Sequence, residues 1–451
     1  MSTAVETAQP SFAAIVGAAR VVADPAHAAA LSVDGQAPQC VVFPTTAEQV
    51  AAVLRCAAEH GLAVIACRNA TKLGVGNVPR RYDVAVSLKE LQRVGHYEPA
   101  DLTVTAEAGM EFGDFQQFVG RDGLWLPLDP PGGARASLGG ILATNASGPL
   151  RLSYGAPRDM VIGMKIATTE GKLIKTGARV VKSVAGYDMA KLLLGSYGTL
   201  GVIVEASFRL YPLPHERMTF VLPAGTLGIA RDLRQRILQS PIQPMRAVLL
   251  DALAAKLTLA GTSLQGKGEE PQLLVEVGGS VRVLERCTRE IEELGKAAGA
   301  PVDRLGTEEA SSAWLSISDF RTWLLRTCPG AVLVRAALPD SATEELLSRA
   351  QQEAENERIP LAGFCQLGVG IVNLALLETS TAAALVALLR RLRKAAQGLG
   401  GVLVVEHCHW DIKSRVDVWG STGDDFAVMA KVKAAWDPKG TLAPGRFVGG
   451  I

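Results

Sequence analysis

Two stretches of small residues have the composition of a binding site for a bulky anionic ligand. One is SLGGILATNASGP at residues 137–149, and the other is RNATKLGVGN at residues 68–77. Glycine and alanine let a backbone approach a ligand closely, and exposed backbone N–H groups at a helix start favour phosphate, so a dinucleotide's diphosphate fits. Close packing of a helix on a sheet explains the first stretch equally well by itself. The second loop, which is similarly small, favours one extended ligand bound by both.

A short polar cluster near the C-terminus could hold a metal ion. The run EHCH places Glu406, His407 and His409 close together, and the two histidines would share one face of a strand. The seven cysteines never occur as Cys-x-x-Cys, so neither an iron–sulfur cluster nor a zinc ribbon is indicated. We expect reduced thiols instead.

The periodicity of apolar residues predicts the elements that must position these stretches. The loop at 68–77 lies between two apolar runs of strand length, and a hairpin is predicted around Glu170 and Gly171. Before residue 215, we predict helices at 44–61 and 111–121 and strands at 62–67, 83–88, 102–108 and 202–210. After it, the chain becomes rich in Leu, Arg and Glu, with predicted helices at 227–239, 283–298, 341–356 and 380–397. A second domain therefore begins near residue 215.

Length and charge limit the class of protein. A chain of 451 residues is too long for one ordinary core, so two or three domains are expected. Its 46 Lys and Arg residues nearly cancel its 45 Asp and Glu residues, which leaves no basic field for nucleic acid. The N-terminal residues predict no secretory signal. The apolar run 361–377 predicts buried strands rather than a transmembrane segment, because three glycines and a glutamine interrupt it.

Neither small-residue stretch is a Rossmann fingerprint or a Walker motif, so another fold must hold the ligand. The run LPLDPPGGARASLGGILATNASGPLRLSYGAPRDMVIG at 126–163 and the run VVKSVAGYDMAKLLLGSYGTLGVIVEASFRLYPLP at 180–214 resemble the FAD-binding domain of the vanillyl-alcohol-oxidase/p-cresol-methylhydroxylase (PCMH) family. More narrowly, they are similar to the FAD-binding E-type subunits of bacterial glycolate oxidases. The resemblance is strong over about 38–214 and returns at VDVWG (416–420) and AWDPKGTLAPGRF (435–447).

This resemblance implies an α+β fold. A PCMH-type FAD-binding domain would span 1–214, with subdomains at about 1–95 and 96–214 that hold FAD between them. An α+β cap domain would span 215–405, and a C-terminal segment, 406–451, would pack back on the FAD domain. By the resemblance, the residues that bind the cofactor would be Arg68, Asn69, Ala70, Thr71, Lys72, Leu73, Pro130, Ser137, Leu138, Gly139, Gly140, Ala143, Thr144, Gly148, Arg151, Tyr154, Gly155 and Val202.

The chain departs from the family in ways that affect the chemistry. Asn69 and Ala70 stand where relatives have consecutive glycines, and the loop lacks the histidine that some members join to FAD, so the flavin should be non-covalent. The metal-binding motif His-x-Gly-Asp-Gly-Asn-x-His of catalytic members appears at 365–374 without histidines, and Gln366 and Leu374 would stand at the ligand positions. Tyr197 replaces an acid of the catalytic members. We therefore expect no bound metal.

The resemblance implies an FAD-dependent oxidoreductase subunit acting on CH–OH donors. The chain would be the FAD-binding subunit of a 2-hydroxy-acid (glycolate or D-lactate) dehydrogenase complex and would transfer electrons through its flavin. Its partners would be a catalytic flavoprotein subunit and an iron–sulfur subunit, in the cytoplasm or peripherally at the inner membrane through those partners. Two alternatives stay open: a stand-alone FAD-dependent dehydrogenase with its own substrate pocket, and an assembly subunit whose FAD is structural. The residues identify no catalytic group.

Overall fold

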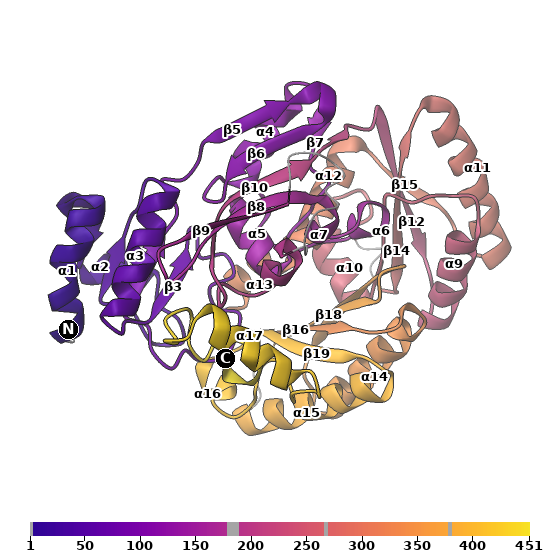
Figure 1. Cartoon of the computed structure of the whole chain (residues 1–451). Coiled ribbons are helices and arrows are strands. Elements are labelled where there is room, and N and C mark those ends of the chain that lie inside the picture. The colour runs from indigo at the N-terminus through magenta and orange to yellow at the C-terminus, as the bar shows by residue number, and fades with distance from the viewer. Residues whose placement is uncertain (1–2, 178–188, 266–268, 378–380) are drawn as a thin grey trace.

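The computed structural model describes residues 3–177, 189–265, 269–377 and 381–451. Its first half contains two sheets that share one hydrophobic core (Figure 1). In the first sheet, of order β1-β2-β4-β3, the strand β4 pairs in parallel with both β2 and β3. These strands are β1 (Val21–Val22), β2 (Cys40–Val42), β3 (Val64–Cys67) and β4 (Val84–Ser87).

The second sheet, of order β5-β6-β10-β8-β9, is antiparallel throughout. Its strands are β5 (Val94–Glu98), β6 (Thr103–Glu107), β8 (Val161–Ala167), β9 (Leu173–Gly177) and β10 (Val202–Arg209). A further pair consists of β7 (Leu124–Trp125) and β11 (Tyr211–Pro212). The predicted hairpin around residue 170 is confirmed as β8 and β9.

Helices of the first half pack their apolar faces into this core. In α3, Thr46 caps the first turn by accepting a hydrogen bond from the N–H of Gln49, and Val53 and Leu54 are fully buried. The helices are α1 (Thr3–Val16), α2 (Pro25–Ala30), α3 (Ala47–Glu59), α4 (Phe112–Gly120), α5 (Leu138–Thr144), α6 (Arg151–Tyr154), α7 (Pro157–Met160) and α8 (Ala190–Leu193). The run at 180–214, on which the resemblance to the PCMH family partly rests, begins with residues that lie outside the described ones, Gly186 among them.

The second half is built on one antiparallel sheet of order β15-β12-β14-β13-β17-β18-β16-β19. The predicted run 361–377 forms two neighbouring strands inside this sheet, and both are almost entirely buried. The strands are β12 (Glu216–Pro223), β13 (Arg246–Leu250), β14 (Gln272–Gly279), β15 (Asp303–Leu305), β16 (Val332–Ala337), β17 (Leu361–Gln366), β18 (Ile371–Leu376) and β19 (Val402–His407).

Two sets of helices cover the two faces of this sheet. One apolar cluster joins it to α9 (Leu227–Gln239), α11 (Val281–Ala298), α14 (Thr343–Asn356) and α15 (Ala382–Gly398), which lie on the outside of the molecule (Figure 1). A second cluster joins the inner face to α10 (Ala252–Thr258), α12 (Thr307–Ser318) and α13 (Phe320–Thr327). Among the described residues, no helix is long and apolar enough to span a bilayer.

The C-terminal residues return to the first half of the chain. After α16 (Trp410–Lys413) and α17 (Phe426–Trp436), Leu442 bridges to Val64 of β3 and joins the first core. The buried Lys433 ammonium donates to the carbonyl oxygen of Thr199 at 2.8 Å. The C-terminal segment is thereby held against β3 and against the residues that lead into β10.

Candidate functional site

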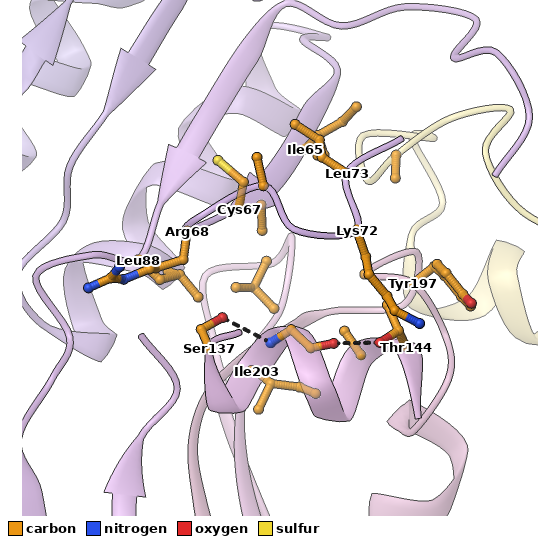
Figure 2. A pocket seen from close by; sticks show the side chains of 18 of the residues that line it. Ile65, Cys67, Arg68, Lys72, Leu73, Leu88, Ser137, Thr144, Tyr197 and Ile203 are labelled. Atoms are coloured by element: carbon orange, nitrogen blue, oxygen red, sulfur yellow. Dashed lines mark hydrogen bonds between the residues drawn. The ribbon is translucent and has the colours of Figure 1, made fainter. Parts of the chain in front are cut away.

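A cavity, here called cavity A, opens between the end of β3, the loop that follows it, and α5 (Figure 2). Its other walls are the segment 196–203, which leads into β10, and the C-terminal residues Ala443 and Arg446. Four segments that are distant in sequence thus enclose one space. Both small-residue stretches contribute to it, as the sequence predicts for one extended ligand.

The loop 68–73 offers unpaired backbone donors to cavity A. The N–H groups of residues 69–72 donate to no acceptor in the described part of the chain. Ala70 has a positive φ of 56°, and a left-handed residue in a turn is a feature of the backbone concavities that bind anions. From behind, the Arg446 guanidinium donates to the carbonyls of Leu73, Val75 and Asn77. The loop is therefore held in place by Arg446, and its N–H groups at 69–72 have no protein acceptor among the described residues.

The start of α5 does not offer such donors, so the expectation of free N–H groups there was wrong. The N–H of Leu138 donates to Met110 at 3.0 Å, and that of Gly139 donates to Ala108 at 2.7 Å. The N–H of Gly140 donates to the Ser137 hydroxyl at 3.2 Å. These groups anchor the helix to the sheet and are not available to an anion.

Small residues in the stretch 137–149 serve packing at some positions and open space at others. A Cβ on Gly148 would lie 2.2 Å from the carbonyl oxygen of Asp129, and one on Gly139 would lie 2.9 Å from Cβ of Ala108. A Cβ on Gly140 would meet only the Ser137 hydroxyl, at 3.1 Å, and this glycine is exposed toward the cavity. Both explanations of the stretch therefore hold, each for different glycines.

A second cavity, cavity B, adjoins cavity A and shares Lys72, Thr144 and Tyr197 with it. Its floor is the sheet of the second half, where four neighbouring strands each contribute one polar side chain. These residues are Gln366 (β17), Asn373 (β18), Arg335 (β16) and Glu406 (β19). Its roof is the segment 144–149, which follows α5, and α13 closes one side with Phe320 and Arg321.

Cavity B contains polar atoms that have no partner in the protein. Buried Oδ1 of Asn145, Oγ of Ser147 and Nδ2 of Asn373 make no hydrogen bond. The Arg335 guanidinium has no hydrogen bond or ion pair among the described residues, whereas Arg321 donates to the backbone carbonyl of Glu406 at 2.9 Å. Buried polar groups are normally satisfied, so these unpaired groups indicate a polar ligand.

Positive charge exceeds negative charge in cavity B. Lys72, Arg321 and Arg335 face one carboxylate, Glu406, whose Oε1 lies 4.0 Å from the Lys72 ammonium. Burial acts to raise the pKa of Glu406, but the three cations outweigh it and leave the pKa below its usual value. Burial lowers the pKa of Arg321. A site with a surplus of cations is suited to an anionic ligand.

The histidines near Glu406 lie elsewhere. His407, the last residue of β19, lines a neighbouring cleft that shares Arg321 with cavity B. Burial, and after it the charge of nearby cations, lowers the pKa of His407 to about 4. The expectation that His407 and His409 share a strand face was wrong, because β19 ends at His407 and His409 caps α16. No group of three or more His, Cys, Asp or Glu side chains in the described residues could hold a metal ion.

The register of β17 and β18 also corrects one position of the degraded metal motif. Gln366 pairs with Ile371 and Phe364 pairs with Asn373, so Asn373 shares a face with Gln366. Leu374 pairs with Gly363 and belongs to the core on the other face. The amides of Gln366 and Asn373, rather than two histidines, therefore face cavity B.

Most of the predicted cofactor residues meet at cavity A. It is lined by Arg68, Asn69, Ala70, Thr71, Lys72, Leu73, Ser137, Gly139, Gly140, Ala143, Thr144 and Val202, and Gly148 lines cavity B. Five predicted residues line neither cavity, and their contact with a cofactor stays a prediction: Pro130, Leu138, Arg151, Tyr154 and Gly155. Leu138 is a core residue, and the Tyr154 ring packs against Trp125 and Tyr211.

Sequence reasoning missed Arg321, Arg335, Asn373 and Arg446. Arg335 had a usable signal, because it is a charged residue inside the apolar strand VLVRAA. Such a residue in a buried strand is paired or faces a site. No pattern near Arg446 in the sequence predicts its role, because that role depends on contacts with a distant loop. Its partner Leu73 lies 373 residues earlier in the chain.

The comparisons with families and solved structures agree with this geometry. Residues 38–177 match the family described as FAD binding domain, and residues 213–447 match FAD linked oxidases, C-terminal domain. Among solved structures, p-cresol methylhydroxylase with substrate bound has a TM-score of 0.81 and 16% identity, covering 99% of this chain and 97% of that one. At this identity the likeness shows the fold alone, which confirms the predicted PCMH-type architecture.

Curated relatives match over most of their length. A D-lactate dehydrogenase [cytochrome], mitochondrial, of Arabidopsis thaliana is 27% identical over 91% of this chain and 73% of its own length. The glycolate oxidase subunit GlcD of Bacillus subtilis (strain 168) is 26% identical over 91% of this chain and 89% of its own length. A D-lactate dehydrogenase of Archaeoglobus fulgidus is 26% identical over 90% of this chain and 91% of its own length.

Proposed function

Because the chain belongs to the family of FAD-linked oxidases, with FAD as its cofactor, we propose that it is the FAD-binding subunit of a 2-hydroxy-acid dehydrogenase complex. The single observation that carries this proposal is the junction of cavities A and B at Lys72, Thr144 and Tyr197. A cradle for a cofactor there adjoins a cationic pocket of the kind that binds a carboxylate. The relatives named D-lactate dehydrogenase and glycolate oxidase subunit support glycolate or D-lactate as the substrate.

Each wall of the junction has a part in this proposal. The N–H groups of residues 69–72 would bind the diphosphate, and Gly140 leaves space for the cofactor. Bound FAD would accept a hydride from the hydroxyl-bearing carbon. Arg321 and Arg335 would hold the substrate carboxylate, and the unpaired amide of Asn373 would donate to a substrate oxygen. Tyr197 and Phe320 would exclude water from this space.

Among the described residues that line cavity B, no side chain is suited to take the hydroxyl proton, which favours a subunit over a complete enzyme. Glu406 has a lowered pKa and is therefore a weak base, and His407 lines the neighbouring cleft rather than cavity B. Proton transfer by a positioned base contributes typically about 10²–10⁴-fold. A catalytic flavoprotein and an iron–sulfur subunit would supply what is missing, in the cytoplasm or at the inner membrane through these partners. The proposed domains are 1–214, 215–405 and a C-terminal segment, 406–451.

A stand-alone dehydrogenase is the second candidate, favoured by the unpaired groups of cavity B. Anaerobic mixing with D-lactate or glycolate distinguishes the two. We expect the isolated chain's flavin to bleach at least about 100-fold more slowly than the chain copurified with its native partners turns over. Bleaching of the isolated chain as fast as that turnover would establish the stand-alone enzyme. If neither preparation bleaches with either acid, the 2-hydroxy-acid function is refuted.

A further inference from the structure

Lys72 lies on the wall that separates cavities A and B. It lines both, together with Thr144 and Tyr197, and its side chain is only 12% exposed. Figure 2 shows the side chain descending from the loop so that its nitrogen ends beside Thr144 and Tyr197. The nearest carboxylate oxygen is Oε1 of Glu406, at 4.0 Å. Within the described residues, this ammonium donates no hydrogen bond.

Two other buried lysines show that such an arrangement is unusual for this protein. The Lys413 ammonium lies 2.8 Å from Asp34 and 2.6 Å from the carbonyl oxygen of Gly74. The Lys433 ammonium binds Asp437 at 2.7 Å and also two backbone carbonyls. A buried charge is costly unless it is paired and hydrogen-bonded. Lys72 has a carboxylate only at 4.0 Å and donates no hydrogen bond among the described residues, so it is less fully paired than either of these lysines and lacks a hydrogen-bonded partner.

The surroundings do not supply that partner. Arg321 and Arg335 also face cavity B and compete for the carboxylate of Glu406. The Tyr197 hydroxyl adds no charge, because burial raises the pKa of this phenol far above its usual value. With three cations and one carboxylate, the site gains from an additional negative charge.

The cofactor's reacting ring must lie at this junction if the proposed function holds. Hydride transfer requires the reacting atoms at about 3–3.5 Å, so a flavin in cavity A and a substrate in cavity B can meet only along the shared wall. A hydride carries two electrons and one proton, and its transfer leaves the flavin ring with one negative charge. The 2-hydroxy acid supplies that hydride, and its hydroxyl proton leaves to a base.

We propose that Lys72 stabilises the negative charge of the reduced flavin and thereby raises the reduction potential of bound FAD. Arg321 and Arg335 remain available for the substrate carboxylate, so the two anions have separate partners. A charge near the ring is one of the means by which a protein tunes a flavin. The inference rests on the proposed function only for the place of the ring, and its tests require no substrate.

Sulfite affinity and the midpoint potential measure this effect directly. Sulfite adds to oxidised flavin and leaves a negative charge on the ring, and it bleaches the flavin's absorption. In the FAD-loaded chain, we expect Lys72→Met to weaken sulfite binding at least about tenfold, because a unit charge at contact range acts strongly even at a high effective dielectric constant. A tenfold change in the equilibrium constant of the two-electron reduction lowers the midpoint potential by about 30 mV, which a dithionite titration measures.

Three further variants separate charge from structure. Lys72→Arg keeps the charge, so its sulfite affinity should stay within about threefold of the wild type. Glu406→Gln removes the one carboxylate near Lys72, so it should tighten sulfite binding. Lys165→Met is the matched control, because Lys165 pairs with Glu205 at 3.0 Å and lines neither cavity. It should leave both measurements unchanged.

Wild-type sulfite affinity and potential in Lys72→Met would overturn the proposal. If Lys72→Met no longer binds FAD, the same two measurements are made on Lys72→Gln. Sulfite affinity equal to the wild type in Glu406→Gln would also count against the proposal. If the flavin reacts with neither glycolate nor D-lactate, either in the isolated chain or in the chain copurified with its native partners, but shows the expected sulfite series, the proposed function is refuted and the role of Lys72 is retained.

Discussion

Gly139 and Gly140 are neighbours in α5 and should respond oppositely to a larger side chain. A Cβ on Gly139 would lie 2.9 Å from Cβ and 3.0 Å from the carbonyl oxygen of Ala108, both inside the core. A Cβ on Gly140 would meet only the Ser137 hydroxyl, at 3.1 Å. Gly139 therefore serves the contact between α5 and the sheet, and Gly140 keeps cavity A open.

The magnitudes follow from these contacts. In Gly139→Ala, overpacking costs about 1–3 kcal/mol, and the better helix propensity of alanine offsets up to about 1 kcal/mol. At the middle of the first range, about 2 kcal/mol, the net cost is about 1–2 kcal/mol. For a domain of about 200 residues, 1 kcal/mol corresponds to about 2–4 °C, so the unfolding midpoint should fall by roughly 2–8 °C. Gly140→Leu should leave the midpoint of the apoprotein within about 2 °C of the wild type, because its side chain enters the cavity.

Thermal unfolding of the apoprotein and titration with FAD, followed by flavin fluorescence, test both variants. We expect Gly140→Leu to weaken FAD binding at least about tenfold, since the added side chain occupies the ligand's space. Gly139→Ala should bind FAD nearly as the wild type does at low temperature. Wild-type FAD affinity in Gly140→Leu would refute the assignment of cavity A. An unchanged unfolding midpoint in Gly139→Ala would refute the packing argument.

Three other outcomes are expected. Acid precipitation should release the flavin into the supernatant, because the loop 68–77 has no histidine to bond it, and a yellow pellet would contradict this. Ala70→Gly should retain FAD binding, whereas Ala70→Val should weaken it roughly tenfold, since φ is +56° and a β-branched residue resists this conformation; equal affinities would contradict it. Burial raises the pKa of Asp251 to about 6, so its contribution to stability is present below about pH 4 and disappears as pH rises through 6, about 3 kcal/mol in all. In urea unfolding, the free energy of unfolding of Asp251→Asn should fall less between pH 4 and 7 than that of the wild type. An equal fall in both proteins would refute the role given to Asp251.

The sequence predicted helices and strands well where a capping residue or one apolar face was enough to define the element. The helix after Thr46, the hairpin of β8 and β9 and the buried strands β17 and β18 all follow from capping chemistry and apolar periodicity. Site chemistry was less accessible, because it depends on strand register. A one-residue change of register exchanges the two faces of a strand, and the register observed here places Asn373 rather than Leu374 on the same face as Gln366.

The same limit explains why the small-residue stretch admitted two explanations. Gly139 and Gly140 are the same residue type, and only the position of Ala108, which follows β6, makes the first a packing contact, whereas the second lines cavity A. Arg446 shows the same dependence on distant residues. It lies near the C-terminal end of the printed sequence and donates to carbonyl groups of the loop at 68–77, and the loop's N–H groups at 69–72 stay unpaired beside cavity A. The loop at 68–77 is therefore held by a residue about 370 positions later in the chain, and cavity A is complete only when the segment that carries Ala443 and Arg446 has packed against β3.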